Sequence, residues 1–105
     1  MHNVIQLLKT NNVVYAWNEQ KNLMLEFERG ICFEEIVYLI ESGCLVEELE
    51  HPNQEKCEGQ KILVVDVGGY AYLVPCKNTV EGKFLKTIIP SRKATKEYIK
   101  QSHDE

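Results

Sequence analysis

The side chains best suited to bind a charged ligand lie near the end of the chain. Residues 83–100 carry five lysines and one arginine against one glutamate, whereas residues 33–58 carry eight glutamates against one lysine. Arg92 follows a strand-like stretch and precedes a helix-like one, where free backbone N–H groups add to the anion affinity of its planar guanidinium. Lys93 and Lys96 extend this basic patch. Such a face can bind phosphate or an acidic protein partner, or it can simply be solvated.

Three further residues could contribute to the same chemistry. Lys86 lies among apolar neighbours in a strand-like run, so it must reach a rim or a groove, as a phosphate ligand or as a snorkelling edge lysine. His51 could act as an acid or a base because imidazole titrates near neutrality, and the alternative is a histidine that caps a loop. Tyr72 shares a strand face with Tyr70. Tyrosines on an open sheet can stack bases, although packing in the core is their commoner fate.

Other site types are not indicated. The four cysteines contain no CxxC pair, which predicts reduced thiols and no metal site. The sequence has no P-loop, GxGxxG, HExxH or nucleophile-elbow motif. We therefore expect no cofactor and no small-molecule substrate.

The bulk composition is that of one globular domain over residues 1–105. The chain is 44% hydrophobic and 27% charged, which suits a single core. No apolar run approaches the roughly 20 residues of a membrane span, and the first residues do not make a signal peptide. We expect a cytoplasmic protein that does not bind membranes.

The N-terminal half predicts a strand followed by two helices. Residues 1–12 form a weakly ordered segment, at most a short amphipathic helix. β-Branched and aromatic residues predict a strand over 13–17. Asn18 is a suitable N-cap for a helix over 19–29, which Gly30 should end.

Apolar spacing predicts which helix faces are buried. Leu23 and Phe27 are four positions apart, at i and i+4, and should both face inward. A second helix begins after Cys32 and ends at Gly43. Its apolar residues repeat at i, i+3, i+4 and i+7, which gives an inward stripe of Phe33, Ile36, Val37 and Ile40.

The C-terminal half is rich in β signals. Gly68-Gly69 predicts a two-residue hairpin turn, because glycine accepts a positive φ. Ser91 can cap a final helix to about residue 101, with lysines outward and Tyr98 and Ile99 resting on the sheet. The predicted strands cover 45–50, 61–67, 70–76 and 83–90. The fold class is therefore α+β, an antiparallel sheet of about four strands with two consecutive helices packed on one face and a short C-terminal helix.

Two stretches resemble a known family. Residues 17–21 (WNEQK) and 28–35 (ERGICFEE) resemble the W-D-x-x-K … K-H-G-V-S-F-E-E segment of BrnT-type toxins. Residues 88–97 (IIPSRKATKE) resemble the I-I-S-A-R-K-A-T-x-x-E ending of the same family. The match spans roughly residues 15–100, with Arg29 standing where the family often has histidine.

The resemblance implies a RelE-like fold of the RelE/ParE superfamily and the toxin role in a type II toxin–antitoxin system. Such a toxin is a metal-independent endoribonuclease acting on mRNA, with or without the ribosome, and a cognate antitoxin neutralises it. Cleavage needs a base for the 2′-OH, a cation for the phosphate and an acid for the leaving oxygen.

On this interpretation the catalytic candidates are Arg92, Lys86 and His51. Arg92 would clamp the phosphate, Lys86 would be a second phosphate ligand, and His51 would be the acid or base. The candidates for RNA binding are Lys93, Lys96, Lys21 and Tyr72, where Lys21 fills the family's lysine position.

The alternative is a non-catalytic binding module of the same fold, directed at gyrase, another protein or a nucleic acid. The net charge of −4 and the lack of a clear cluster of His, Arg and Lys favour this class.

Overall fold

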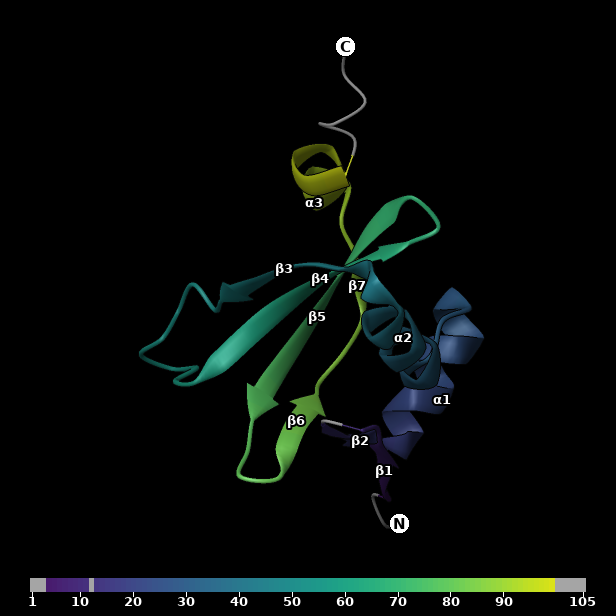
Figure 1. The fold of residues 1–105 in the computed structure, drawn as a ribbon, viewed down its shortest axis with the longest axis vertical. Helices are drawn as coiled ribbons and strands as arrows, with labels where there is room; N and C mark the ends of the chain where they lie inside the picture. Colours follow the sequence, from purple (N-terminus) through teal and green to yellow (C-terminus); the bar gives the residue numbers. More distant parts are fainter. Residues whose placement is uncertain (1–3, 12, 100–105) are drawn as a thin grey trace.

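One mixed sheet of seven strands, with helices on both faces, makes up the computed structural model, which describes residues 4–11 and 13–99 (Figure 1). The first half contains β1 (Ile5–Lys9), β2 (Val14–Asn18), α1 (Glu19–Arg29), α2 (Phe33–Leu39) and a π-helical turn, η1 (Ile40–Cys44). The second half contains β3 (Leu45–Glu50), β4 (Gln60–Val67), β5 (Tyr70–Asn78), β6 (Gly82–Leu85), β7 (Ile89–Pro90), α3 (Arg92–Ala94) and a second π-helical turn, η2 (Thr95–Ile99).

The strand order places the N-terminal hairpin, β1 and β2, beside β6 of the C-terminal half. It runs β1-β2-β6-β5-β4-β3, with β7 paired to β5. Neighbouring strands are antiparallel except for β2 and β6, which are parallel. The α+β class and the mostly antiparallel sheet agree with the sequence prediction, whereas the sheet has more strands than the four expected.

The extra strand at the N-terminal edge corrects the prediction of a weak or helical segment over 1–12. β1 pairs along its whole length with β2, from Ile5 opposite Asn18 to Lys9 opposite Val14. Side chains alternate with a period of two. Leu8 accordingly packs against the main core, while Ile5 and Leu7 lie on the opposite face. Residues 1–3 and Asn12 lie outside the described residues.

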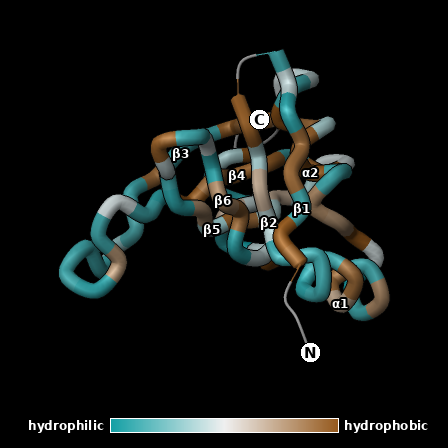
Figure 2. The backbone as a smooth tube through the Cα atoms, turned by 90° about the horizontal axis from the view of Figure 1, so that it is seen from below, coloured by the Kyte–Doolittle hydropathy of each residue, from teal (hydrophilic) through white to brown (hydrophobic). Residues whose placement is uncertain are grey.

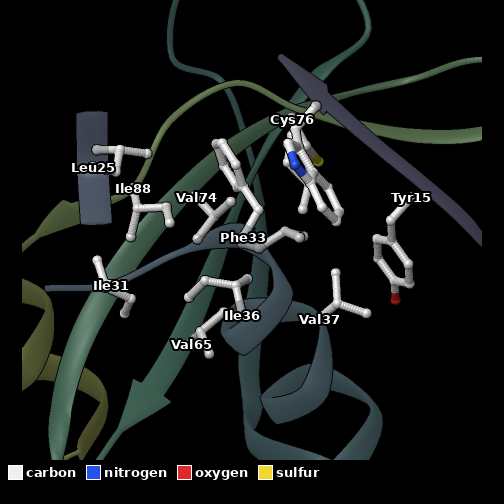
Figure 3. Packing of buried hydrophobic residues seen from close by; sticks show 13 residues of the cluster. Tyr15, Leu25, Ile31, Phe33, Ile36, Val37, Val65, Val74, Cys76 and Ile88 are labelled. Atoms are coloured by element: carbon white, nitrogen blue, oxygen red, sulfur yellow. The ribbon is translucent and has the colours of Figure 1, made fainter. Parts of the chain in front are cut away.

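The main core fills the space between α1, α2 and the sheet (Figure 3). Trp17 and Phe33 stack at its centre, with ring centroids 5.6 Å apart. Ile36 and Val37 of α2 are buried beside them, which confirms the predicted stripe. The sheet contributes the residues that alternate toward the helices, which are Tyr15, Leu63, Val65, Val74, Cys76 and Leu85.

The opposite face of the sheet, called here the open face, is covered at one end only. Val64 and Ala71 point to this side and pack against Ala94, with Tyr98 and Ile99 against them. The prediction that Tyr98 and Ile99 rest on the sheet is therefore confirmed. No other helix of the described residues covers this face.

The predicted inward face of α1 is wrong. The exposed fractions of Leu23 and Phe27 are 58% and 92%, and the buried residues of the helix are Asn22 and Leu25. The carbonyl oxygen of the Asn22 side chain accepts a hydrogen bond from Phe33 N at 2.6 Å, and its NH₂ group donates to Glu34 at 2.8 Å. These bonds tie α1 to the start of α2 and turn Asn22 inward.

The predicted strand over 83–90 is interrupted. Leu85 lies opposite Cys76 and Ile89 opposite Leu73, so this segment advances four residues while β5 advances three. The extra residue makes a bulge in which Ile88 is fully buried. The Arg29 guanidinium donates a hydrogen bond to the Ile88 carbonyl.

Local turn and cap signals were confirmed. Asn18 caps α1, since its side chain accepts from Lys21 N at 3.0 Å. Gly30 ends the helix with φ of 70°, and Gly68 and Gly69 form the β4–β5 turn with φ of 61° and 93°. Ser91 Oγ accepts from Ala94 N at 3.0 Å.

Replacing Asn22 by leucine, which has a similar volume, should lower the free energy of unfolding by about 2 kcal/mol, because the buried Phe33 N–H loses its acceptor. Urea unfolding measures the change. Gln20→Leu, on the exposed side of the same helix, is the control and should change stability little. An Asn22→Leu protein as stable as wild type would show that the hydrogen bonds do not hold the helices in place.

Gly82→Ala should separate β2 from β6. A Cβ atom at position 82 would lie 2.0 Å from the Val14 carbonyl oxygen, and this backbone contact can be relieved only by moving a strand. We expect a loss of about 3 kcal/mol in the urea assay and faster amide exchange in β2. Glu81→Ala, at the neighbouring exposed residue, should change neither the stability nor the amide exchange of β2. Equal amide-exchange rates in the Gly82→Ala and Glu81→Ala proteins would contradict the tight contact.

Candidate functional surface

Three lysines lie on the open face, as the strand pairing shows. Lys9 is opposite Val14, and Lys77 is opposite Phe84. Lys86 N donates to the Pro75 carbonyl at 2.8 Å, which extends the β5–β6 register by one residue. Directly paired residues share a face of a sheet. All three lysines are exposed.

The cations of α3 and η2 lie at the covered end of this face. Arg92, Lys93 and Lys96 are exposed, whereas Ala94 and Thr95 are buried against the sheet. The segment is fixed there because Ser91 N donates to the Ala71 carbonyl and Ala71 N donates to Thr95 Oγ1 at 2.8 Å.

Arg92 and Lys86 are on the same side of the molecule but not in contact. Ser91 sits beside Ala71, and Lys86 sits beside Pro75, four residues further along β5. Four residues of strand span about 13 Å. The two side chains can therefore reach different phosphates of one strand of nucleic acid.

His51 lies at the far end of the same sheet. Its backbone N–H donates to the Gln60 carbonyl, and its Nδ1 accepts from Asn53 N at 3.1 Å. Gln60 is opposite Lys77, six residues along β5 from the Ala71 level, or about 20 Å. His51 therefore caps the β3–β4 loop and cannot share a phosphodiester with Arg92, since proton transfer needs hydrogen-bond reach.

Tyr72 and Lys21 are on the other side of the sheet. Tyr72 packs against the main core and meets Tyr70 edge-on, with ring centroids 6.0 Å apart. Lys21 lies in the first turn of α1, within the helical layer. The structure thus brings Lys86, Arg92, Lys93 and Lys96 to one side of the molecule and leaves His51, Tyr72 and Lys21 apart from them.

An apolar hollow that the sequence did not indicate lies at the uncovered end of the open face. It has a volume of about 290 Å³ and lies between β1, β2 and β6. Its apolar lining is Ile5, Leu7, Val14, Ala16 and Phe84. Figure 2 shows the brown, hydrophobic residues of β1 at this edge. The alternation of Ile5 and Leu7 was the available signal, but the adjacent Leu8 obscured it.

Two buried ionisable groups on the helix side, Tyr15 and Cys76, are in structural positions. Tyr15 donates to Glu41 at 2.9 Å, and burial together with this carboxylate raises the pKa of the phenol above its usual range. Burial also raises the pKa of the Cys76 thiol, with Lys83 opposing the effect. Both groups stay protonated at neutral pH, so neither is an activated base or nucleophile. The described residues contain no group of three metal-binding side chains.

Charge is separated between the two sides of the molecule. Residues 19–44, which form the helical layer, carry six glutamates against Lys21 and Arg29, a net charge of −4. The open face and the α3–η2 segment carry six cations against three carboxylates: the cations are Lys9, Lys77, Lys86, Arg92, Lys93 and Lys96, and the carboxylates are Glu47, Asp66 and Glu97. A molecule that is acidic overall therefore presents one basic surface.

Within the part of the chain that the structure describes, none of the helices has the length and apolar character needed to span a bilayer.

The chain matches no protein-family model, no curated protein and no solved structure.

Proposed function

We propose that this chain is a toxin-type domain that binds RNA through its open face and α3 without cleaving it. The observation that carries the proposal is that the six cations of the open face and the α3–η2 segment lie on one side of an acidic protein. Phosphate contacts from lysine and arginine supply most of the affinity of a protein for nucleic acid.

The geometry suits an extended strand of RNA. Lys9 of β1, Lys77 of β5 and Lys86, directly after β6, are spread across the sheet. The cations of the α3–η2 segment continue the surface about 13 Å further on. Arg92 and Lys96 are four residues apart in the α3–η2 segment, so they share a side of it. Apolar Phe84 lies among the lysines and offers a surface on which a base can stack.

Binding without cleavage is preferred because of where His51 lies. Metal-free cleavage requires a base and an acid within about 3 Å of the reacting oxygens. His51 is the one histidine of the described residues, and its Nδ1 is engaged in the loop about 20 Å from the Arg92 end. The toxin assignment itself rests on the resemblance to BrnT-type sequences, which also implies a cognate antitoxin.

The combined change Lys86→Gln, Arg92→Gln and Lys96→Gln should weaken binding to a 2′-O-methyl RNA oligonucleotide, which resists cleavage. Three lost phosphate contacts should reduce the slope of log affinity against log salt by about 2, since each contact to a single strand contributes roughly 0.7. Fluorescence anisotropy across a salt series measures both the affinity and its dependence on salt. Lys56→Gln, in the exposed β3–β4 loop, should match wild type. An unchanged slope in the triple variant would show that RNA does not bind through these three side chains.

The second candidate is the metal-independent endoribonuclease. It is favoured by the exposed Arg92 at the junction of β7 and α3, inside the motif that resembles the BrnT ending. An endoribonuclease should fragment RNA with free 2′-OH groups in the presence of a chelator, and expression without an antitoxin should arrest growth.

If the protein is an endoribonuclease, Arg92→Ala should abolish both RNA fragmentation and growth arrest. Urea denaturation checks that the variant folds. Fragmentation by wild type and not by Arg92→Ala would refute binding without cleavage. Intact RNA with retained binding is the outcome that we expect.

A further inference from the structure

The solvent side of α1 carries a stripe of large apolar side chains. Leu23, Met24 and Phe27, called here the α1 stripe, have exposed fractions of 58%, 48% and 92%. At 3.6 residues per turn these three positions lie within an arc of about 100°. The buried residues Asn22 and Leu25 lie on the other side of the helix. An amphipathic helix normally turns such a stripe toward the core, so an outward stripe marks an interaction surface.

Glutamates border the α1 stripe on both sides. On the helical projection Glu26 falls about 60° from Leu23, and Glu28 falls about 40° from Met24 on the other edge. Both are exposed, and neither forms a salt bridge within the described part of the chain. Of the two cations of α1, Arg29 points toward the Ile88 carbonyl, and Lys21 lies about two turns before Glu28 near the same edge of the stripe.

We propose that the α1 stripe is a docking site for a basic amphipathic helix of a partner protein. Apolar side chains of that helix would cover Leu23 and Met24 and enclose Phe27, which is an aromatic anchor of the type that dominates interface energies. Its lysines or arginines would face Glu26 and Glu28. The surrounding helical layer adds to this match, since residues 19–44 have a net charge of −4.

A second copy of this chain fits the site less well. In a twofold dimer the same patch meets itself, so α1 packed against α1 would place Glu26 and Glu28 of one protomer near those of the other. Like charges so placed are repulsive. The charge of the layer therefore favours a basic partner over self-association.

The test uses two synthetic amphipathic helices with the same leucine stripe, one flanked by lysines and one by glutamates. The full chain should bind the lysine peptide, with an affinity that falls as salt rises, and should not bind the glutamate peptide. Phe27→Ser should weaken binding by about tenfold or more. Because Phe27 is almost fully exposed, this variant should fold normally, as urea denaturation can verify.

Two further variants separate charge from apolar contact. Glu26→Gln with Glu28→Gln should weaken lysine-peptide binding and flatten its salt dependence. Val80→Ser removes an equally exposed apolar residue in the β5–β6 turn and should leave binding unchanged. The proposal does not depend on RNA binding, since none of these residues lies on the open face.

Three results would overturn the assignment. They are no binding of the lysine peptide, equal binding of both peptides, and wild-type binding by Phe27→Ser. Concentration-dependent dimerisation in analytical ultracentrifugation that Phe27→Ser abolishes would also overturn it, because the occupant would then be a second copy.

Discussion

A single buried amide, that of Asn22, fixes the way the helical layer sits on the sheet. Its oxygen accepts from Phe33 N, and its nitrogen donates to Glu34 and to Glu19, so it joins the start of α2 to α1. A buried amide is stable only when its partners are satisfied, and none of the described buried side-chain polar atoms lacks one. Because this polar group occupies the inward side of α1, the apolar residues at the adjacent positions are left in solvent.

The same arrangement explains why the two sides of the molecule differ. The glutamate-rich helices cover one face of the sheet, where Lys83 and Lys61 are matched by Glu48 and Glu50 at 3.5 and 3.3 Å. The lysines that alternate to the other face form no salt bridge within the described part of the chain. One side is therefore suited to polyanions and the other to cationic segments, and a protein with a modest net charge carries two surfaces of opposite preference.

Features set by neighbouring residues were predictable from the sequence. The stripe of Phe33, Ile36 and Val37, the Gly68-Gly69 turn and the Ser91 cap depend only on local spacing and backbone preference. The i, i+4 pair of Leu23 and Phe27 shows that two apolar residues share a helix face, but it does not show which way that face points. The hydrogen bond from Phe33 N to the Asn22 side chain decides which face of α1 is buried.

Features set by distant residues were not predictable. The bulge at Ile88 involves Arg29, which lies 59 residues earlier in the chain. β1 was missed because the adjacent Leu7 and Leu8 hide the alternation. For the candidate site, the basic C-terminal segment was sufficient to place Arg92, Lys93 and Lys96 together. Placing Lys86 on the same face of the sheet and His51 at the other end required the register of four strands.

The parallel pairing of β2 with β6 has a consequence for how the protein is made. Val14 and Gly82 are neighbours in space but 68 positions apart in the sequence. During translation the β1–β2 hairpin emerges long before β6 exists. For that time the core around Trp17 and Tyr15 lacks the side chains that β4, β5 and β6 contribute. Closing a loop of this length is slow. Until it closes, the nascent chain exposes apolar surface that can aggregate. The core can therefore be completed only after the C-terminal strands β6 and β7 have been made.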